Sequence, residues 1–247
     1  MNNATTFANR EVCNLVFCEY GTDKPFLSCD FANTTSTELT GESVYAYGGK
    51  GHPKRVAFNG ERGGTLTIET QLQTAKLYSL LTGGELETTA RFIKREKVTA
   101  GEAGKLTVSG TPAGKETVNV FAAGDDCGTP IEVSEASASS ITATGVQSGE
   151  DYVVYYLEDI SSGAKKISVK ADTFPKAFTV YGETFMKTED DQIIPYKLVA
   201  YKCAPQSNLS LSFANSGDPS TVTITCDLLA DDDGNILDMI MLDGDAA

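Results

Sequence analysis

The chain has 247 residues, enough for one large β domain or two smaller ones. Its 20 Lys and Arg oppose 34 Asp and Glu, a formal net charge of −14, which argues against a surface that grips nucleic-acid phosphates. No apolar run approaches the roughly 20 residues of a membrane helix, and the first twenty residues lack the pattern of a signal peptide.

The first 98 residues are rich in short β-type runs. The strands expected there span residues 11–19, 26–31, 43–47, 55–58, 65–70 and 86–96. Asn59-Gly60 is a common turn pair, so the fourth and fifth of these strands are expected to form a hairpin. The second arm of that hairpin places Thr65, Thr67 and Glu69 on the face opposite its apolar side chains. The polar residues 33–40 are expected to form a loop.

One helix is expected, at residues 71–82. Its apolar residues recur at helical spacing, and Gly83-Gly84 supplies a stop signal directly after it.

The composition changes near Val98. Residues 99–172 are rich in Gly, Ala, Ser, Thr and Val, and their short β runs recur at intervals of roughly 8–12 residues. This pattern predicts a small β-sandwich inserted into a discontinuous domain of residues 1–98 and 173–247. The competing interpretation is that the same residues continue the main sheet.

Residues 208–229 carry the clearest pattern of the chain. Two runs alternate apolar with small hydroxyl residues on either side of a turn at residues 215–219. The hydroxyl residues are Ser210, Ser212, Thr221, Thr223 and Thr225. Alternation with a period of two predicts a hairpin with one apolar face, which needs a core, and one smooth polar face. Further strands are expected at residues 178–186, 193–203 and 236–242.

Catalytic and metal-binding patterns are weak. The single histidine, His52, lies in a glycine-rich loop without the spacing of a phosphate-binding loop, and no GxSxG motif is present. The acidic run Asp231–Asp233 lacks the order of an EF-hand. So acidic a chain is compatible with a pair of carboxylates that hydrolyses glycosides, but it contains no Trp to stack on sugars. We therefore expect no enzyme, cofactor or metal, and six reduced cysteines.

Three stretches of the chain follow a recognisable order. They are residues 47–84, where a hairpin leads into a helix, residues 174–186, and residues 193–240. This order resembles the major tail tube proteins of tailed bacteriophages, and the inserted module resembles the Ig-like additions found in several of them. The resemblance implies a mainly β subunit, a β-sandwich or split barrel with one flanking α-helix. It also implies six subunits per ring, and rings stacked into a hollow tube through which DNA is ejected.

Transferred by position, the two hairpins would line the lumen of such a tube. The expected lumen-facing residues are Thr65, Thr67, Glu69, Ser210, Ser212, Thr221, Thr223 and Thr225. The loop at residues 48–55 carries several cations and is expected to dock on the adjacent ring. The residues expected to make this contact are Lys50, His52, Lys54 and Arg55. In a monomer, the same hydroxyls would only face solvent and the cations would be ordinary surface charge.

The resemblance also implies partners and a location. The chain would form a homo-oligomer and contact a tape measure protein, a tail terminator, and a baseplate or tip. DNA would cross the lumen without specific binding, and the protein would be assembled in the host cytoplasm into the virion tail. The alternatives are the inner tube of a contractile injection system and a carbohydrate- or cell-surface-binding β module.

Overall fold

The computed structural model describes residues 6–242, and the expected mainly β fold is confirmed there. The chain divides into two compact units. The first combines residues up to Glu85 with residues from Ile167 onward, and the second spans Leu86–Lys166. The second unit includes β7 (Ala90–Thr99), because this strand pairs with β12 (Asp151–Ile160) along its whole length. The expected boundary at residue 99 leaves most of β7 outside the inserted unit.

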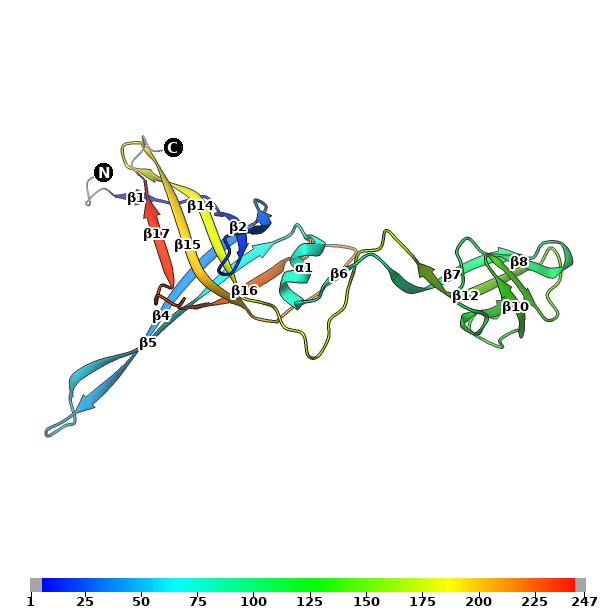
Figure 1. The fold of residues 1–247 in the computed structure, drawn as a ribbon, viewed down its shortest axis with the longest axis horizontal. Coiled ribbons are helices and arrows are strands. Elements are labelled where there is room, and N and C mark those ends of the chain that lie inside the picture. The colour runs from blue at the N-terminus through cyan, green and yellow to red at the C-terminus, as the bar shows by residue number, and fades with distance from the viewer. Residues whose placement is uncertain (1–5, 243–247) are drawn as a thin grey trace. The chain divides into compact units, whose positions relative to one another are not determined.

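The first unit is built on a nine-stranded sheet within the described residues, and all of its strand pairs are antiparallel (Figure 1). Its strands are β1 (Phe7–Ala8), β2 (Asn14–Glu19), β3 (Pro25–Cys29), β4 (Thr34–Tyr47), β5 (Lys54–Thr70), β14 (Phe178–Thr188), β15 (Ile193–Pro205), β16 (Val222–Leu229) and β17 (Leu237–Met241). The order across the sheet is β3-β2-β14-β15-β16-β5-β4, with β1 beside β14 and β17 beside β15.

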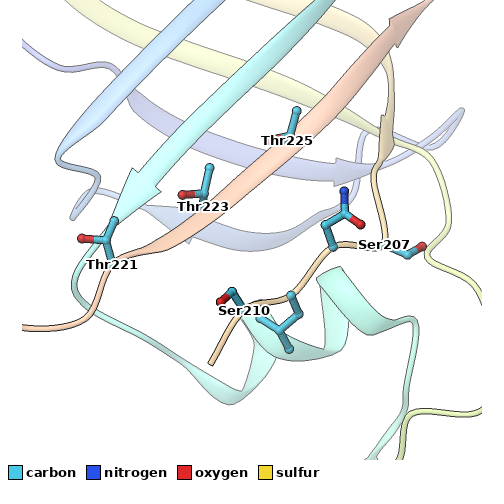
Figure 2. Close-up of a pocket in the computed structure, with 7 residues that line it drawn as sticks. Ser207, Ser210, Thr221, Thr223 and Thr225 are labelled. Carbon is cyan, nitrogen blue, oxygen red and sulfur yellow. The ribbon is translucent and has the colours of Figure 1, made fainter. Parts of the chain in front are cut away.

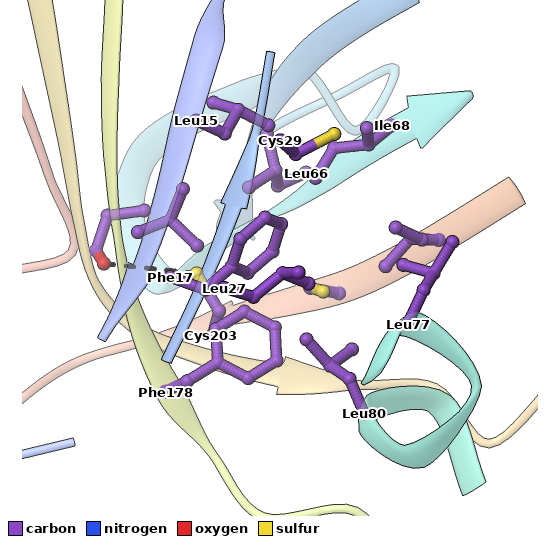
Figure 3. Packing of buried hydrophobic residues seen from close by; sticks show 14 of the residues in the cluster. Leu15, Phe17, Leu27, Cys29, Leu66, Ile68, Leu77, Leu80, Phe178 and Cys203 are labelled. Atoms are coloured by element: carbon purple, nitrogen blue, oxygen red, sulfur yellow. Dashed lines mark hydrogen bonds between the residues drawn. The ribbon is translucent and has the colours of Figure 1, made fainter. Parts of the chain in front are cut away.

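The core of this unit lies on one face of the sheet. Strands from β3 to β5 in the sheet order contribute to one cluster, so this part of the sheet curls around it. Cys29 of β3 lies near Leu66 of β5 (Figure 3). Phe17 is fully buried and its ring centroid lies 5.3 Å from that of Phe178. The free cysteines Cys203 and Cys226 belong to the same cluster.

The helix α1 (Ala75–Thr82) covers this core with Leu77, Leu80 and Leu81 (Figure 3). It starts later than expected because Thr74 caps it: the Thr74 hydroxyl accepts a hydrogen bond from the backbone N–H of Leu77. Gly83 ends the helix in the left-handed conformation, with φ 71°. A Cβ at Gly83 would lie 2.5 Å from the carbonyl carbon of Phe174, so a larger residue does not fit.

Two predictions for β4 and β5 are wrong. Residues 34–40 belong to a strand instead of a loop, and Asn59-Gly60 lies within β5, where Asn59 pairs with Ser43. The hairpin turns at residues 48–53 instead. A register shift between Gly41 and Ser43 lets the ladder continue past Asn59-Gly60.

The predicted C-terminal hairpin is only half formed. Val222–Leu229 is a strand, but residues 206–221 are not, and β16 pairs with β5 and β15. Ser210 and Ser212 therefore lie in a connecting segment and not in a strand opposite Thr223.

The second unit contains two three-stranded sheets. Its strands are β6 (Leu86–Glu87), β7 (Ala90–Thr99), β8 (Lys105–Thr107), β9 (Asn119–Ala122), β10 (Val133–Ser137), β11 (Ser140–Ala143) and β12 (Asp151–Ile160). The sheets β10-β11-β8 and β7-β12-β9 enclose one core between them. Strand β13 (Lys166–Ile167) pairs with β6 in a separate two-stranded sheet.

A half-buried carboxylate anchors this second unit. Glu96 accepts hydrogen bonds from the Tyr156 hydroxyl and from the backbone and side chain of Ser109, and it lies 3.4 Å from the Lys94 ammonium. The Tyr156 hydroxyl in turn accepts from the backbone N–H of Gly110. Burial raises the pKa of Glu96, but the hydrogen bonds from Tyr156 and Ser109, with Lys94, outweigh it and hold the pKa at about 2.

This low pKa makes the stability of the second unit depend on acid pH. Glu96 has an ordinary pKa of 4.5 and a folded pKa of about 2, so its contribution is complete above pH 4.5 and is lost as the pH falls towards 2. Replacing Glu96 by Gln should therefore reduce the amount by which the free energy of unfolding of the second unit falls between pH 7 and pH 3. Urea unfolding, followed by amide signals of this unit, measures the effect. The exposed Glu135→Gln is the control; a slope unchanged in Glu96→Gln would contradict the prediction.

Candidate functional site

The face of the main sheet that points away from the core carries a polar patch. Three paired rows cross β4, β5 and β16 there. The rows are Thr34–Glu69–Thr223, Ser36–Thr67–Thr225 and Glu38–Thr65–Asp227. Directly paired residues project to the same side of a sheet, so these nine side chains share one surface, which we call the hydroxyl face.

The hydroxyl face consists of six hydroxyls and three carboxylates, with no Lys, Arg or His among its nine residues. Its β4 residues and Thr223 are exposed, and its β5 residues are half-buried. Asp227 accepts a hydrogen bond from the Gln206 amide at 2.9 Å. Two rows beyond Asp227, Lys202 pairs with Leu229, and its ammonium lies 5.0 Å from the centre of the Tyr20 ring. The surface is therefore negative and polar, with a base only at its margin.

The structure brings together five of the eight residues predicted for this surface. Thr65, Thr67, Glu69, Thr223 and Thr225 all lie on the hydroxyl face. Thr221 directly precedes β16.

The two predicted serines lie outside the paired rows. Ser210 lines a pocket of about 430 Å³ with Thr221, Thr223 and Thr225 (Figure 2). Ser212 is exposed in the connecting segment.

Sequence reasoning missed four residues of the hydroxyl face, namely Thr34, Ser36, Glu38 and Asp227. The first three lie in the segment that was expected to be a loop. The signal that could have found them is composition, because four of the residues 34–40 are Thr, a β-branched residue enriched in strands.

Beyond the hydroxyl face, β4 and β5 continue as a hairpin that no other strand of the described chain pairs with (Figure 1). We call residues 41–62 the arm. On the same side of the ribbon, Val44 pairs with Phe58 and Ala46 with Val56. Val44, Val56 and Phe58 are 66%, 49% and 58% exposed. The arm thus presents an uncovered apolar strip, which is typical of an interaction surface.

The four residues predicted for docking lie at the tip of the arm, and all are exposed. Lys54 places its ammonium 3.7 Å from the centre of the Tyr45 ring. Arg55 donates to the backbone carbonyl of Gly48 at 3.3 Å. His52 adopts a left-handed backbone with φ 49° in the turn, and Lys50 lies two residues before it.

The arm and the rest of the chain differ in charge. Four Lys and Arg oppose two Glu between residues 41 and 62, a net of +2. The net charge of the whole chain is −14, so the remaining residues together carry −16. The arm is therefore complementary in charge to the rest of an identical copy.

No group of three or more metal-ligating side chains occurs among residues 6–242. Over the same residues, the only α-helix is α1, and it is too short to span a bilayer.

No match was found among curated proteins. The model of the YomU/Tube protein family matches residues 9–241, which is most of the chain. The chain therefore belongs to the YomU/Tube protein family, a family of phage tube-like structural proteins.

Proposed function

We propose that this chain assembles with identical copies into stacked rings, six subunits to a ring, and that the stack forms the tail tube through which phage DNA is ejected. One observation carries the proposal: the same two strands, β4 and β5, carry the hydroxyl face at one end and the uncovered apolar arm at the other. The first surface suits a wall that must not bind, and the second suits a contact between subunits.

The hydroxyl face is assigned to the bore. DNA carries one negative charge per roughly 1.7 Å of its axis, and proteins bind it by neutralising phosphates with Lys and Arg. Glu38, Glu69 and Asp227 carry negative charge, as the phosphates do, and therefore repel them. At physiological salt their repulsion acts over about 8 Å, so it affects only DNA that passes close to the wall. The hydroxyls keep the wall wetted between the carboxylates.

The arm is assigned to contact between rings. Its apolar strip gains free energy on leaving water, at about 25 cal/mol for each Å² buried. Lys50, His52, Lys54 and Arg55 at its tip would face the acidic surface of the adjacent copy, and such charge pairs mainly select the orientation of the contact.

The family points to the virion tail as the location, and the remaining assignments follow from it. The ends of the tube would contact the tape measure protein, the tail terminator, and the baseplate or tip. Assembly would take place in the host cytoplasm. The inserted second unit is assigned to an Ig-like module carried by the tube.

Electron microscopy of the purified chain tests this function directly. In negative stain at high protein concentration, the chain should form rings or hollow filaments. An exclusively monomeric chain, across concentration and salt and also in the presence of tail initiator proteins, would contradict the proposal.

A charge reversal tests the bore separately. Phage with the double substitution Glu69→Lys and Thr223→Lys should assemble tails but deliver DNA more slowly, since two ammonium groups would hold passing phosphates. The matched control is Thr107→Lys with Glu135→Lys, two exposed residues of the second unit that change the net charge equally. Delivery is measured as DNA release over time from purified particles. Equal rates in the two variants would place the hydroxyl face away from the bore.

A further inference from the structure

Strand β16 has an open edge along half of its length. On one side β5 pairs with it from Val222 to Leu228, but on the other side β15 pairs only with Cys226–Leu229. The last bond on that side runs from the backbone N–H of Gln206 to the carbonyl of Thr225, at 2.8 Å. Beyond it, residues 207–210 run beside β16, and the pocket of about 430 Å³ lies between the two segments (Figure 2).

The backbone of Thr223 faces this opening. The carbonyl of Glu69, the β5 partner of Thr223, accepts from Asn33 on the β4 side, so Glu69 and Thr223 do not bond to each other. Backbone groups alternate in direction along a strand, and the Thr225 carbonyl two residues away already bonds towards Gln206. The N–H and C=O of Thr223 are therefore directed at residues 207–210, and neither has a backbone partner there among the described residues.

The neighbouring segment has the sequence to fill the opening. Continuing the register from the pair Pro205–Cys226 sets Asn208 opposite Thr223, Leu209 opposite Val222, and Ser210 opposite Thr221. Leu209 would then lie on the core face, and it already packs against the core cluster. The polar Asn208 and Ser210 would extend the hydroxyl face by one more strand.

The opening persists in a single subunit because closure gains little there. Ordering the segment loses backbone entropy, and the Asn208 N–H must first give up its bond to the Gln206 carbonyl, at 2.8 Å. The other new bonds replace bonds to water. The same connecting segment also carries Leu211 and Phe213, which are 53% and 92% exposed. These two side chains provide the missing free energy once another surface covers them.

We propose that residues 207–211 close onto the open edge of β16 as an added strand when a second copy of the chain covers Leu211 and Phe213. This inference rests on the proposed tube assembly and adds a step to it. The last strand of the hydroxyl face forms only in the assembled particle, so a free subunit keeps this part of its wall incomplete.

Hydrogen exchange of single amides tests the closure. The Thr223 amide should exchange roughly 100-fold or more slowly in the assembled particle than in the subunit, because a closed ladder must open before exchange occurs. The Ile224 amide, directed at β5, is the internal control and should be slow in both. Particles in which Thr223 exchanges as fast as in the subunit would overturn this inference alone. Absence of any particle would contradict the proposed function as well.

A pair of proline variants tests the backbone bonds. Ser210→Pro removes an N–H that the added strand would direct at Thr221, whereas Ser207→Pro removes one directed away from β16. Both variants should match the wild type in urea unfolding of the subunit. Ser210→Pro should fail to assemble at concentrations where Ser207→Pro forms tubes. Equal assembly of the two variants would overturn the proposal.

Discussion

Replacing Phe58 by Asp should abolish assembly while the subunit stays folded. Phe58 is 58% exposed and lies in the arm opposite Val44, so the change removes little packing within the subunit. In the proposed contact the same position is covered, and an unpaired carboxylate in an apolar contact costs several kcal/mol. Each subunit contributes this cost once, so the total cost in free energy grows with every subunit added to the tube. Sedimentation and negative stain measure the loss.

The control for this change is Phe92→Asp. Phe92 lies in β7 of the second unit and is 63% exposed, so residue type and exposure match those of Phe58. Phe92→Asp should assemble like the wild type, and both variants should keep the urea midpoint of the wild type. If Phe58→Asp forms normal tubes, the arm does not make the assembly contact. If its urea midpoint falls, Phe58 stabilises the subunit itself.

Replacing Phe17 by Ala should have the largest effect on stability, lowering the free energy of unfolding of the first unit by about 3–5 kcal/mol. Phe17 is fully buried, and its ring packs against Phe178 at 5.3 Å and Phe26 at 6.4 Å between centroids. The sheet curls around these rings, so the surrounding strands cannot collapse into the space without losing their register. Urea unfolding of the first unit measures the change.

Val16→Ala is the matched control. Val16 is the neighbour of Phe17 on β2, but it lies on the opposite face and is 36% exposed. It should lower the free energy of unfolding by no more than about 0.5 kcal/mol. Similar losses at both positions would mean that the core does not lie on the Phe17 face of β2.

The sequence predicts elements best where a single strand or helix has both a burial pattern and end signals. The helix α1 is such a case, with periodic leucines and the stop Gly83, although its start was predicted four residues before Ala75 because the cap Thr74 was not recognised. Strand β16 is another, because Val222, Ile224 and Cys226 are buried and their neighbours are not. These local signals agree with the tertiary structure, and the predictions are confirmed.

The sequence fails where pairing, and not burial, determines the strand. In β4 and the arm, most side chains are exposed on both faces, so no apolar period marks the strand. The pair Asn59-Gly60 favours a turn in isolation, but the ladder to β4 continues past it with a shift in register. At residues 208–213 the opposite occurs: the alternation is present, but the segment has no ladder. Local sequence thus indicates which residues can form a strand, and not which partner is available.

The candidate site was half accessible from the sequence for the same reason. Thr65 and Thr67 were found because they alternate with buried Leu66 and Ile68. Glu38 was missed because its strand has no buried face there. Only the paired rows show that three carboxylates share the surface.

The length of β5 has a consequence for the symmetry of any assembly joined through the arm. Pairing with β16 begins at Gly64, ten residues after Lys54, so the tip lies roughly 33 Å from that surface at about 3.3 Å per residue. A subunit would then donate a tip to one copy and receive another tip on a different surface, which is a head-to-tail contact. A polymer of this kind has direction. One end of the polymer exposes tips without an acceptor, and the other end exposes acceptor surfaces without a tip. A protein that stops growth by covering one end therefore does not fit the other end.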